Sequence, residues 1–169
     1  MSDKSVSYWS DTRQGLRAVE LRAAGFEPSE AVNTNAVVTI ANAYTNAHRC
    51  NNRVRRIADL LVDAVASKGG QGLLVGAPAV SDALTQGTVN AGYSLASRDL
   101  MADCMETGHY AHHGNGMIVV SGCDKTGAAA LMPLARTNAF GLVVYPGTSS
   151  PGRVGLEPRA SKGNNLTIM

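Results

Sequence analysis

Residues 116–147, GMIVVSGCDKTGAAALMPLARTNAFGLVVYPG, predict a strand, a helix and a second strand in direct succession. The two flanking runs, GMIVVSG and FGLVVYPG, are short, apolar and rich in β-branched residues, as is typical of strands buried on both faces of a sheet. The segment TGAAALMPLARTN between them is the predicted helix, with Pro133 in its interior. A helix that joins two buried strands favours a parallel pair, because parallel strands need a long crossover.

The preceding residues continue this alternation toward the N-terminus. AVVTIANA, from Ala36, predicts a buried strand, and NNRVRRIADLLVDAVASKGG predicts an amphipathic helix closed by Gly69 and Gly70. QGLLVGAPAV predicts another strand, and SRDLMADCMETGHY predicts a helix that Ser97 caps. The sequence therefore predicts an α/β fold with a mostly parallel β-sheet flanked by helices on both faces.

The 169 residues are enough for one compact domain, and they divide into three predicted parts. Residues 1–35 are expected to form an N-terminal helical leader, with a helix around residues 12–24. Residues 36–153 are expected to form the α/β domain, and residues 154–169 a loop-like tail without a fifth strand.

Composition and charge indicate which kinds of partner and which cellular location to expect. A formal charge of +2, with no basic cluster interleaved with aromatics, argues against both nucleic acid and an anionic membrane as partners. The sequence contains no apolar run of transmembrane length and no signal peptide, so we expect a cytoplasmic protein. Three cysteines without an export signal indicate reduced thiols or metal ligands rather than a disulfide framework.

A thiol, an acid and an amine stand side by side in the turn after the strand GMIVVSG, at Cys123, Asp124 and Lys125. Cys50 follows the first predicted strand, and Asp82 follows the second. Ligands of parallel α/β sheets bind at the carboxyl ends of the strands. We therefore expect these five residues to meet at one edge of the sheet.

Other readings of these residues are weaker. Cys104 lies on the apolar face of a predicted helix and is expected in the core. Taken alone, Cys123 fits a small buried hydrophobe better than a ligand, and its charged neighbours Asp124 and Lys125 are what favour a functional role. The histidines of HYAHH, residues 109–113, favour cationic partners for helix carbonyls over a metal patch, and only proximity to Cys50 supports His48. DKTG also begins the phosphorylated-aspartate motif of P-type ATPases, but Ala128 stands where that motif has a second hydroxyl residue.

Four segments in order, ANAYTNAHRCN, PAVSDALTQG, GYSLASRDLMAD and GCDKTGAAALMPLARTN, carry a resemblance to a known family. From about Val37 to Arg153 the sequence resembles the N-terminal domain of the dihydroxy-acid dehydratase and phosphogluconate dehydratase family. The resemblance implies a hydro-lyase that removes water from a 2,3-dihydroxy carboxylic acid to give a 2-keto acid, in the first place a dihydroxy-acid dehydratase of branched-chain amino acid biosynthesis. The alternative substrate is a sugar acid, an aldonate or phosphogluconate, which the TQG after Asp82 slightly favours.

The resemblance also implies cofactors and ligands. Cys50 and Cys123 fall on two of the family's three cysteines for an iron–sulfur cluster, of the [2Fe-2S] or [4Fe-4S] type. Asp82 and Asp124 fall on Mg²⁺-binding aspartates, and Lys125 on a lysine that is carbamylated to become a further oxygen ligand. The surface that meets the family's second domain would stay uncovered, so we expect a homo-oligomer.

The sequence also departs from the family. The third cluster cysteine, a further Mg²⁺ carboxylate and the serine base belong to later family segments that these residues do not match, so no catalytic base is assigned and the isolated chain is expected to be inactive. HRCN stands in place of a proline–cysteine pair, and GAAALM in place of a proline–glycine helix start. A fragment of an enzyme and a degenerate, non-catalytic binding or oligomerisation module therefore both remain open.

Overall fold

The computed structural model describes residues 11–26, 36–148, 152–153 and 165–166. Its main feature is a four-stranded sheet with the strand order β2-β1-β3-β4. All neighbouring strands are parallel. The strands are β1 (Val37–Asn42), β2 (Gln71–Gly76), β3 (Gly116–Val120) and β4 (Phe140–Val144).

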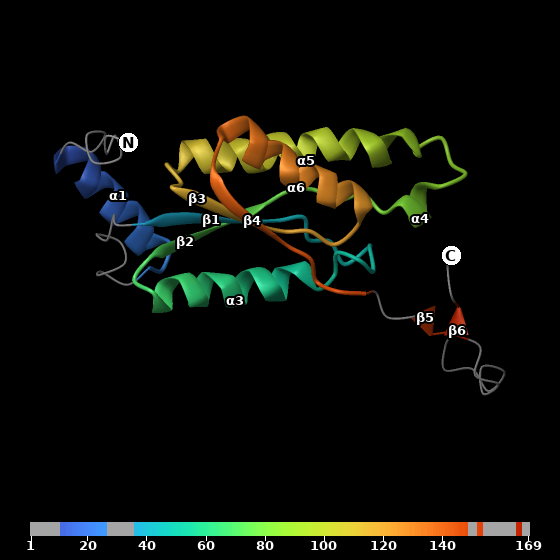
Figure 1. Cartoon of the computed structure of the whole chain (residues 1–169), viewed down its shortest axis with the longest axis horizontal. Helices are drawn as coiled ribbons and strands as arrows, with labels where there is room; N and C mark the ends of the chain where they lie inside the picture. The colour runs from blue at the N-terminus through green and yellow to red at the C-terminus, as the bar shows by residue number, and fades with distance from the viewer. Residues whose placement is uncertain (1–10, 27–35, 149–151, 154–164, 167–169) are drawn as a thin grey trace.

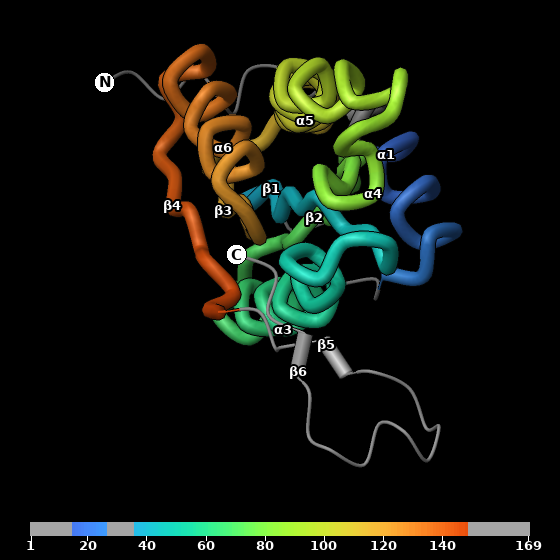
Figure 2. Tube along the Cα trace, turned by 90° about the vertical axis from the view of Figure 1, so that its right-hand side faces the viewer, coloured from blue at the N-terminus to red at the C-terminus, as the bar shows by residue number. Residues whose placement is uncertain are grey.

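Helices cover both faces of this sheet (Figure 1). α3 (Val54–Ser67) lies on one face, whereas α5 (Gly92–Ala111) and α6 (Asp124–Thr137) lie side by side on the other. The view along the sheet in Figure 2 shows the same layers, with β4 at the outer edge. The predicted α/β fold is confirmed, including its parallel sheet and the helices on both faces.

The core has two apolar layers, one on each face of the central strands. Ile40 and Val120 pack against Val54 and Ala58 of α3. On the opposite face, Met117 packs with small and flexible side chains of α5 and α6, namely Met101, Met105, Ala129 and Ala130. Alanines of α6 and flexible methionines of α5 thus fill this layer without aromatic rings, which fits a sequence with only 5% aromatic residues.

Two expectations about α5 need correction. The helix begins at Gly92 rather than after Ser97, through a turn that Asn90 and Ala91 start. Ser97 is buried inside the helix, where its hydroxyl donates to the carbonyl of Ser94 at 2.6 Å. Serine can bond to the preceding turn in this way, so a good cap residue does not by itself mark a helix start. Cys104 packs against the core but is only half-buried.

The N-terminal helix is confirmed as α1 (Asp11–Ala23), which precedes the sheet and reaches it through a hydrogen bond from Arg17 to the Gln71 side chain. A short strand in the tail, β6 (Asn165–Leu166), pairs antiparallel with β5 (Gly152–Arg153), which lies just before the tail. The expectation of a tail without further strands is therefore wrong at these residues, and the rest of the tail lies outside the described residues. Among the described helices, none combines the length and apolar character needed to cross a bilayer.

The strand order creates a crevice at the carboxyl ends of β1 and β3. β1 leads to α3 on one face, and its neighbour β3 leads to α6 on the other. The two connecting loops therefore diverge, which is the geometry at which open α/β sheets bind ligands. The loops after β1 and β3 carry Cys50 and Cys123, respectively.

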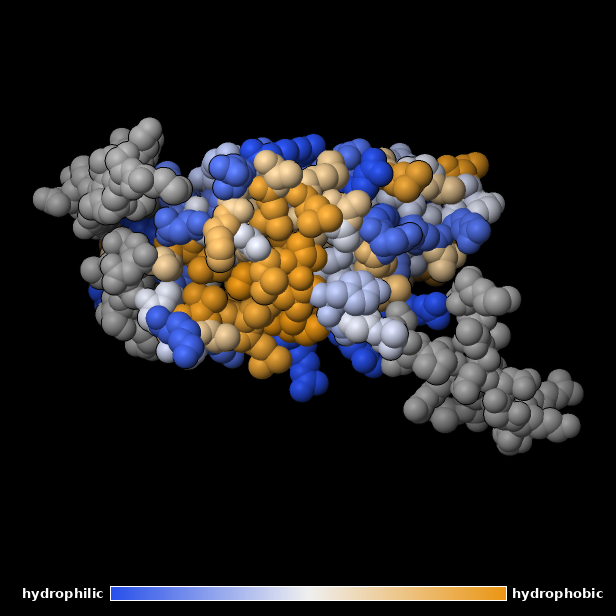
Figure 3. All heavy atoms as spheres, viewed as in Figure 1, coloured by the Kyte–Doolittle hydropathy of each residue, from blue (hydrophilic) through white to orange (hydrophobic). Residues whose placement is uncertain are grey.

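One face of β4 is left bare. α3 packs mainly against β2 and β1, so it does not reach the strand at the opposite edge. Phe140 is 91% exposed and Leu142 is 55% exposed. On the same face of the sheet, an apolar groove beside α3 is lined by Val38 of β1, Ile118 of β3, and Leu61 and Val65 of α3. Figure 3 shows apolar side chains gathered across the middle of this view of the molecule.

Candidate functional site

The turn between β3 and α6 is held by one hydroxyl. Thr126 Oγ1 accepts backbone N–H groups of Gly122 at 3.0 Å and of Cys123 at 2.8 Å. These N–H groups precede the helix and would otherwise lack an intrahelical partner. The threonine therefore fixes the backbone from which the Cys123 side chain, 8% exposed, enters the crevice.

Gly122 brings the loop of Cys50 against this turn. A Cβ atom at residue 122 would lie 2.2 Å from the carbonyl oxygen of Cys50 and 2.6 Å from Oδ1 of Asn51. The side-chain amide of Asn51 donates to the Ala43 carbonyl at 2.6 Å and so holds the loop after β1 in place. Only glycine permits this approach, so the two cysteine-bearing loops touch through their backbones.

Asp82 and Lys125 meet in the same crevice. Lys125 Nζ lies 2.7 Å from Asp82 Oδ1 and 2.9 Å from the hydroxyl of Ser94, and it also donates to the carbonyl of Val80. The lysine side chain is 5% exposed, whereas that of Asp82 is 50% exposed. The amine therefore sits inside a ring of oxygens, with the carboxylate at the boundary with solvent.

These contacts shift the pKa of two side chains. Partial burial would raise the pKa of Asp82, but hydrogen bonds from Lys125 and Ser94 and the charge of Lys125 outweigh it and lower the pKa. The pKa of His48 is lowered, first by burial and then by the charge of Lys125. Asp82 is therefore held as a carboxylate and His48 as a neutral ring.

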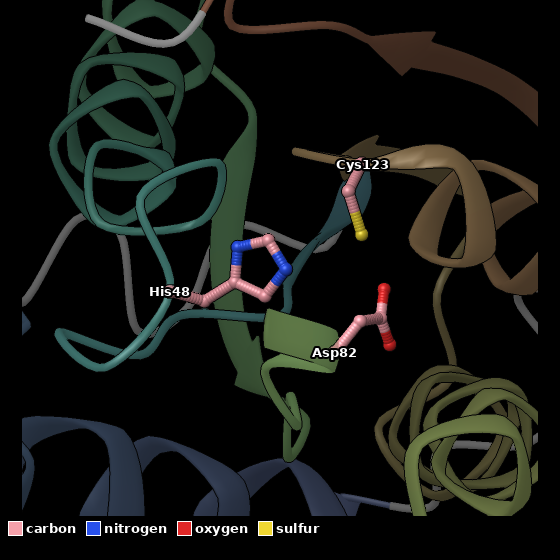
Figure 4. Close-up of side chains that lie close together, drawn as sticks. All are labelled: His48, Asp82 and Cys123. Atoms are coloured by element: carbon pink, nitrogen blue, oxygen red, sulfur yellow. The ribbon is translucent and has the colours of Figure 1, made fainter. Parts of the chain in front are cut away.

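His48, Asp82 and Cys123 form a compact group of nitrogen, oxygen and sulfur (Figure 4). One such atom from each residue lies within 4.8 Å of the other two. His48 and Cys123 are both 8% exposed, so only Asp82 borders solvent. A mixed set of this kind can hold a metal ion of borderline softness, such as Zn²⁺ or Fe²⁺.

The remaining predicted residues take different places. Asp124 is exposed at the rim, where its Oδ1 accepts the backbone N–H of Lys125 at 2.8 Å. Cys50 is half-buried, and its backbone N–H donates to Nδ1 of His48 at 3.1 Å. The structure thus brings Asp82, Lys125, Cys123 and the backbone of Cys50 together, with Asp124 at their edge.

We did not expect His48 at the centre of the site, because its one signal in the sequence is a position two residues before Cys50. The expectation that the histidines of HYAHH act as cationic partners for helix carbonyls is correct in position for His112 but wrong for His109. His112 does bond the helix end, with Nδ1 2.8 Å from the Gly108 carbonyl. His109 instead is 5% exposed, lies 3.0 Å from Thr39 Oγ1, and has a pKa lowered by burial, so it is no cationic cap.

Comparison with known proteins identifies the family of the chain that forms this crevice. The dihydroxy-acid/6-phosphogluconate dehydratase N-terminal family matches residues 35–167. The chain belongs to this family. Its matched region contains both touching loops and the whole group of site residues.

Individual dehydratases show the same relationship. Dihydroxy-acid dehydratase 1 of Cupriavidus pinatubonensis is 38% identical over 133 residues, which cover 79% of this chain and 23% of that protein. Dihydroxy-acid dehydratase 3 of Bordetella bronchiseptica is 36% identical over 141 residues, covering 83% of this chain and 24% of that protein. The dihydroxy-acid dehydratase of Ralstonia nicotianae is 36% identical over 136 residues, 80% of this chain and 23% of that protein. The chain spans about a quarter of the length of these relatives.

Proposed function

We propose that this chain forms the metal-binding α/β part of a dehydratase that converts a 2,3-dihydroxy carboxylic acid into a 2-keto acid. The observation that carries the proposal is the contact of Asp82 with Lys125 beside Cys123, across the crevice of the family fold. These residues come from two separate family segments and meet only in the folded chain. Membership in the dehydratase family supplies the type of reaction.

The oxygen atoms around Lys125 fit Mg²⁺ in their chemistry. The carboxylate of Asp82, the hydroxyl of Ser94 and the carbonyl of Val80 are hard donors converging on one point, which the lysine amine occupies. An ammonium there opposes a cation, and a carbamate on Lys125 would reverse that charge. We propose that Asp82, a carbamylated Lys125 and Asp124 at the rim hold Mg²⁺.

The thiols fit a softer group. We propose that Cys123 and Cys50, on the two touching loops, take part in binding an iron–sulfur cluster, since thiolates are its usual ligands. Bound metals of these two kinds act as Lewis acids, which stabilise an enolate and help hydroxide to leave. The chain's own part is to position the two metals side by side.

The substrate class has two candidates. The relatives named above are dihydroxy-acid dehydratases, so a branched-chain dihydroxy acid is our first proposal. The family description also covers 6-phosphogluconate dehydratases, which keeps a sugar acid as the second. A cytoplasmic location stays a prediction from the sequence, and association of copies through the bare face of β4 is proposed from its exposed apolar residues.

Metal loading tests the proposal directly. The chain is incubated anaerobically with iron and sulfide, and the absorption of thiolate-bound iron is measured. Cys50→Ser and Cys123→Ser are each expected to abolish most of this absorption. Cys104→Ser is the matched control, because Cys104 packs against the core away from the crevice and should leave the absorption unchanged. Equal loading of all three variants would contradict the assignment of Cys50 and Cys123.

Activity gives a second readout. Formation of 2-keto acid is assayed from dihydroxy-isovalerate and from several aldonic acids. We expect no sustained turnover by these 169 residues alone, because the family's base and third cluster cysteine have no counterpart among them. Turnover that Cys123→Ser abolishes would show that the chain supplies its own base.

A further inference from the structure

The proposed function gives no role to His48, yet the loop after β1 fixes the direction in which its ring presents a proton. The residue lies in the loop after β1 and is only 8% exposed. Its carbonyl accepts the N–H of Asn51 at 2.9 Å, and its ring Nδ1 accepts the N–H of Cys50 at 3.1 Å. Both the backbone and the ring of His48 are therefore held by the same turn.

The bond to Nδ1 determines the tautomer. A nitrogen that accepts a backbone N–H carries no proton of its own, so the proton of the neutral ring is on Nε2. A ring protonated on Nδ1 would place two N–H groups against each other. The geometry therefore makes Nε2 of His48 a hydrogen-bond donor.

This donor faces the crevice. Figure 4 shows the Nε2 side of the ring turned toward the sulfur of Cys123 and the carboxylate of Asp82. Within the described part of the chain, no hydrogen-bond acceptor is paired with Nε2. Nε2 is not among the described polar atoms that are sealed from solvent without a partner, so its N–H reaches the open part of the crevice, where the atom of an entering ligand can accept it.

The neighbouring carboxylate of Asp82 restricts which chemical group can bind beside His48. Oδ1 of Asp82 already accepts from Lys125 and Ser94, while Oδ2 has no hydrogen-bond partner among the described residues. A hydroxyl group can accept from Nε2–H of His48 and donate to Oδ2 of Asp82 at the same time. A carboxylate oxygen can only accept, and Asp82 would repel it.

We infer that His48 and Asp82 bind one hydroxyl group of the substrate, with Nε2–H of His48 as the donor to its oxygen. The inference rests on the proposed function for the identity of the substrate, a dihydroxy acid. It assigns a substrate-binding role to a side chain in the HRCN segment, where the sequence departs from the family's proline–cysteine pair. A donor role for Nε2 competes with its use as a metal ligand in the group of His48, Asp82 and Cys123, so the two roles are alternatives that an experiment can separate.

The first measurement is the tautomer. The full chain is labelled with ¹⁵N in its four histidines, and the ring nitrogens are observed by long-range ¹H–¹⁵N NMR. Single His→Gln variants at residues 109, 112 and 113 assign the signals. We expect the His48 ring to be protonated on Nε2, and an Nδ1–H tautomer would overturn the inference. Added Zn²⁺ that binds tightly and removes the Nε2 proton would overturn it as well, in favour of a metal site.

The second measurement is binding. Dihydroxy-isovalerate, the neutral diol 2,3-butanediol and isovalerate, which lacks both hydroxyls, are titrated while the Nε2–H signal is followed. We expect the two hydroxyl compounds to shift this signal and isovalerate to leave it in place. His48→Phe should weaken binding of dihydroxy-isovalerate about tenfold, whereas His48→Gln, which keeps a donor near Nε2, should restore most of it. His112→Phe, at an exposed position, is the matched control.

The outcomes separate the inference from the proposed function. Binding of the dihydroxy acid that is unchanged in His48→Phe would overturn the inference and leave the function standing. Binding of the neutral diol alone, lost in His48→Phe, would support the hydroxyl site and count against an acid substrate. No hydroxyl compound binding to the unmodified chain would overturn both.

Discussion

Lys125 and Asp82, 43 positions apart in the sequence, form an ion pair of 2.7 Å in which the amine is buried and the carboxylate is half-exposed. This asymmetry predicts unequal effects of removing either partner. Asp82→Ala leaves a buried ammonium with neutral acceptors only. We expect a loss of about 2 kcal/mol, less than for a fully buried pair because solvent already screens the carboxylate.

Lys125→Met is expected to cost about 1 kcal/mol or less, because water can hydrate the half-exposed carboxylate that remains. Urea unfolding followed by circular dichroism measures both variants. Asp59→Ala, which removes an exposed pair with Arg55, serves as the control and should change stability by less than about 0.5 kcal/mol. A larger loss for Lys125→Met than for Asp82→Ala would show that the amine is not buried as the structure has it.

Gly122→Ala should separate the two cysteine-bearing loops. Its Cβ would overlap the carbonyl oxygen of Cys50 at 2.2 Å, and a backbone atom cannot move aside as a flexible side chain can. We expect a loss of about 2 kcal/mol or more in urea unfolding, with faster amide exchange at Asn51. Gly127→Ala is the matched control, since its Cβ would meet only Ser121 Oγ at 3.7 Å. That substitution lies within α6 and should be neutral or stabilising by up to about 1 kcal/mol.

Acid should weaken the fold through His109. Burial lowers the pKa of this ring in the folded chain, whereas the unfolded chain binds the proton near the ordinary value of about 6.5. The unfolded state therefore binds more protons below that value, and stability, constant above it, falls as the pH decreases toward the folded pKa. One such group contributes a slope of at most about 1.4 kcal/mol per pH unit.

Urea unfolding at several values of pH between neutral and mildly acidic measures this slope. His109→Gln should make it shallower, while His112→Gln, at an exposed position, should leave it unchanged. His48 contributes in the same direction, because burial and Lys125 lower its pKa too. A slope that is identical in His109→Gln and in the parent chain would contradict the neutral, buried state of this ring.

The bare face of β4 should promote association between copies. Leu142 is 55% exposed on the face that α3 does not cover, beside Phe140 at 91%. Leu142→Asp is expected to reduce self-association by at least tenfold, because burying a charge opposes contact of the apolar face. Sedimentation at increasing protein concentration gives the measurement. Val89→Asp, at a position 99% exposed, is the control and should leave association unchanged. A parent chain that stays monomeric at all concentrations would contradict the expectation.

Periodicity along the chain was sufficient to predict the α/β fold. The runs that became β1 and β3 are short and mostly apolar, as is typical of strands buried on both faces. The run that became β4 has the same character, but the expectation of burial on both faces is wrong for it, because none of the described helices covers the face that carries Phe140 and Leu142. The start of α5 was not predictable from Ser97, because a serine can cap a helix or bond inside one, and packing decides between the two. The pairing of β5 with β6 joins residues too far apart in sequence for a local pattern to show.

For the site, the sequence by itself determined which chemical groups follow the carboxyl ends of the strands, because parallel strands all end at the same edge of a sheet and Asp82 and Cys123 each follow one of them. Only the tertiary structure decided that Lys125 is paired with Asp82 while Asp124 faces solvent, since neighbours in a helix point in different directions. It also decided the role of His48. The tautomer of that ring depends on one backbone N–H of Cys50, and such a bond exists only once the loop after β1 has folded against Gly122.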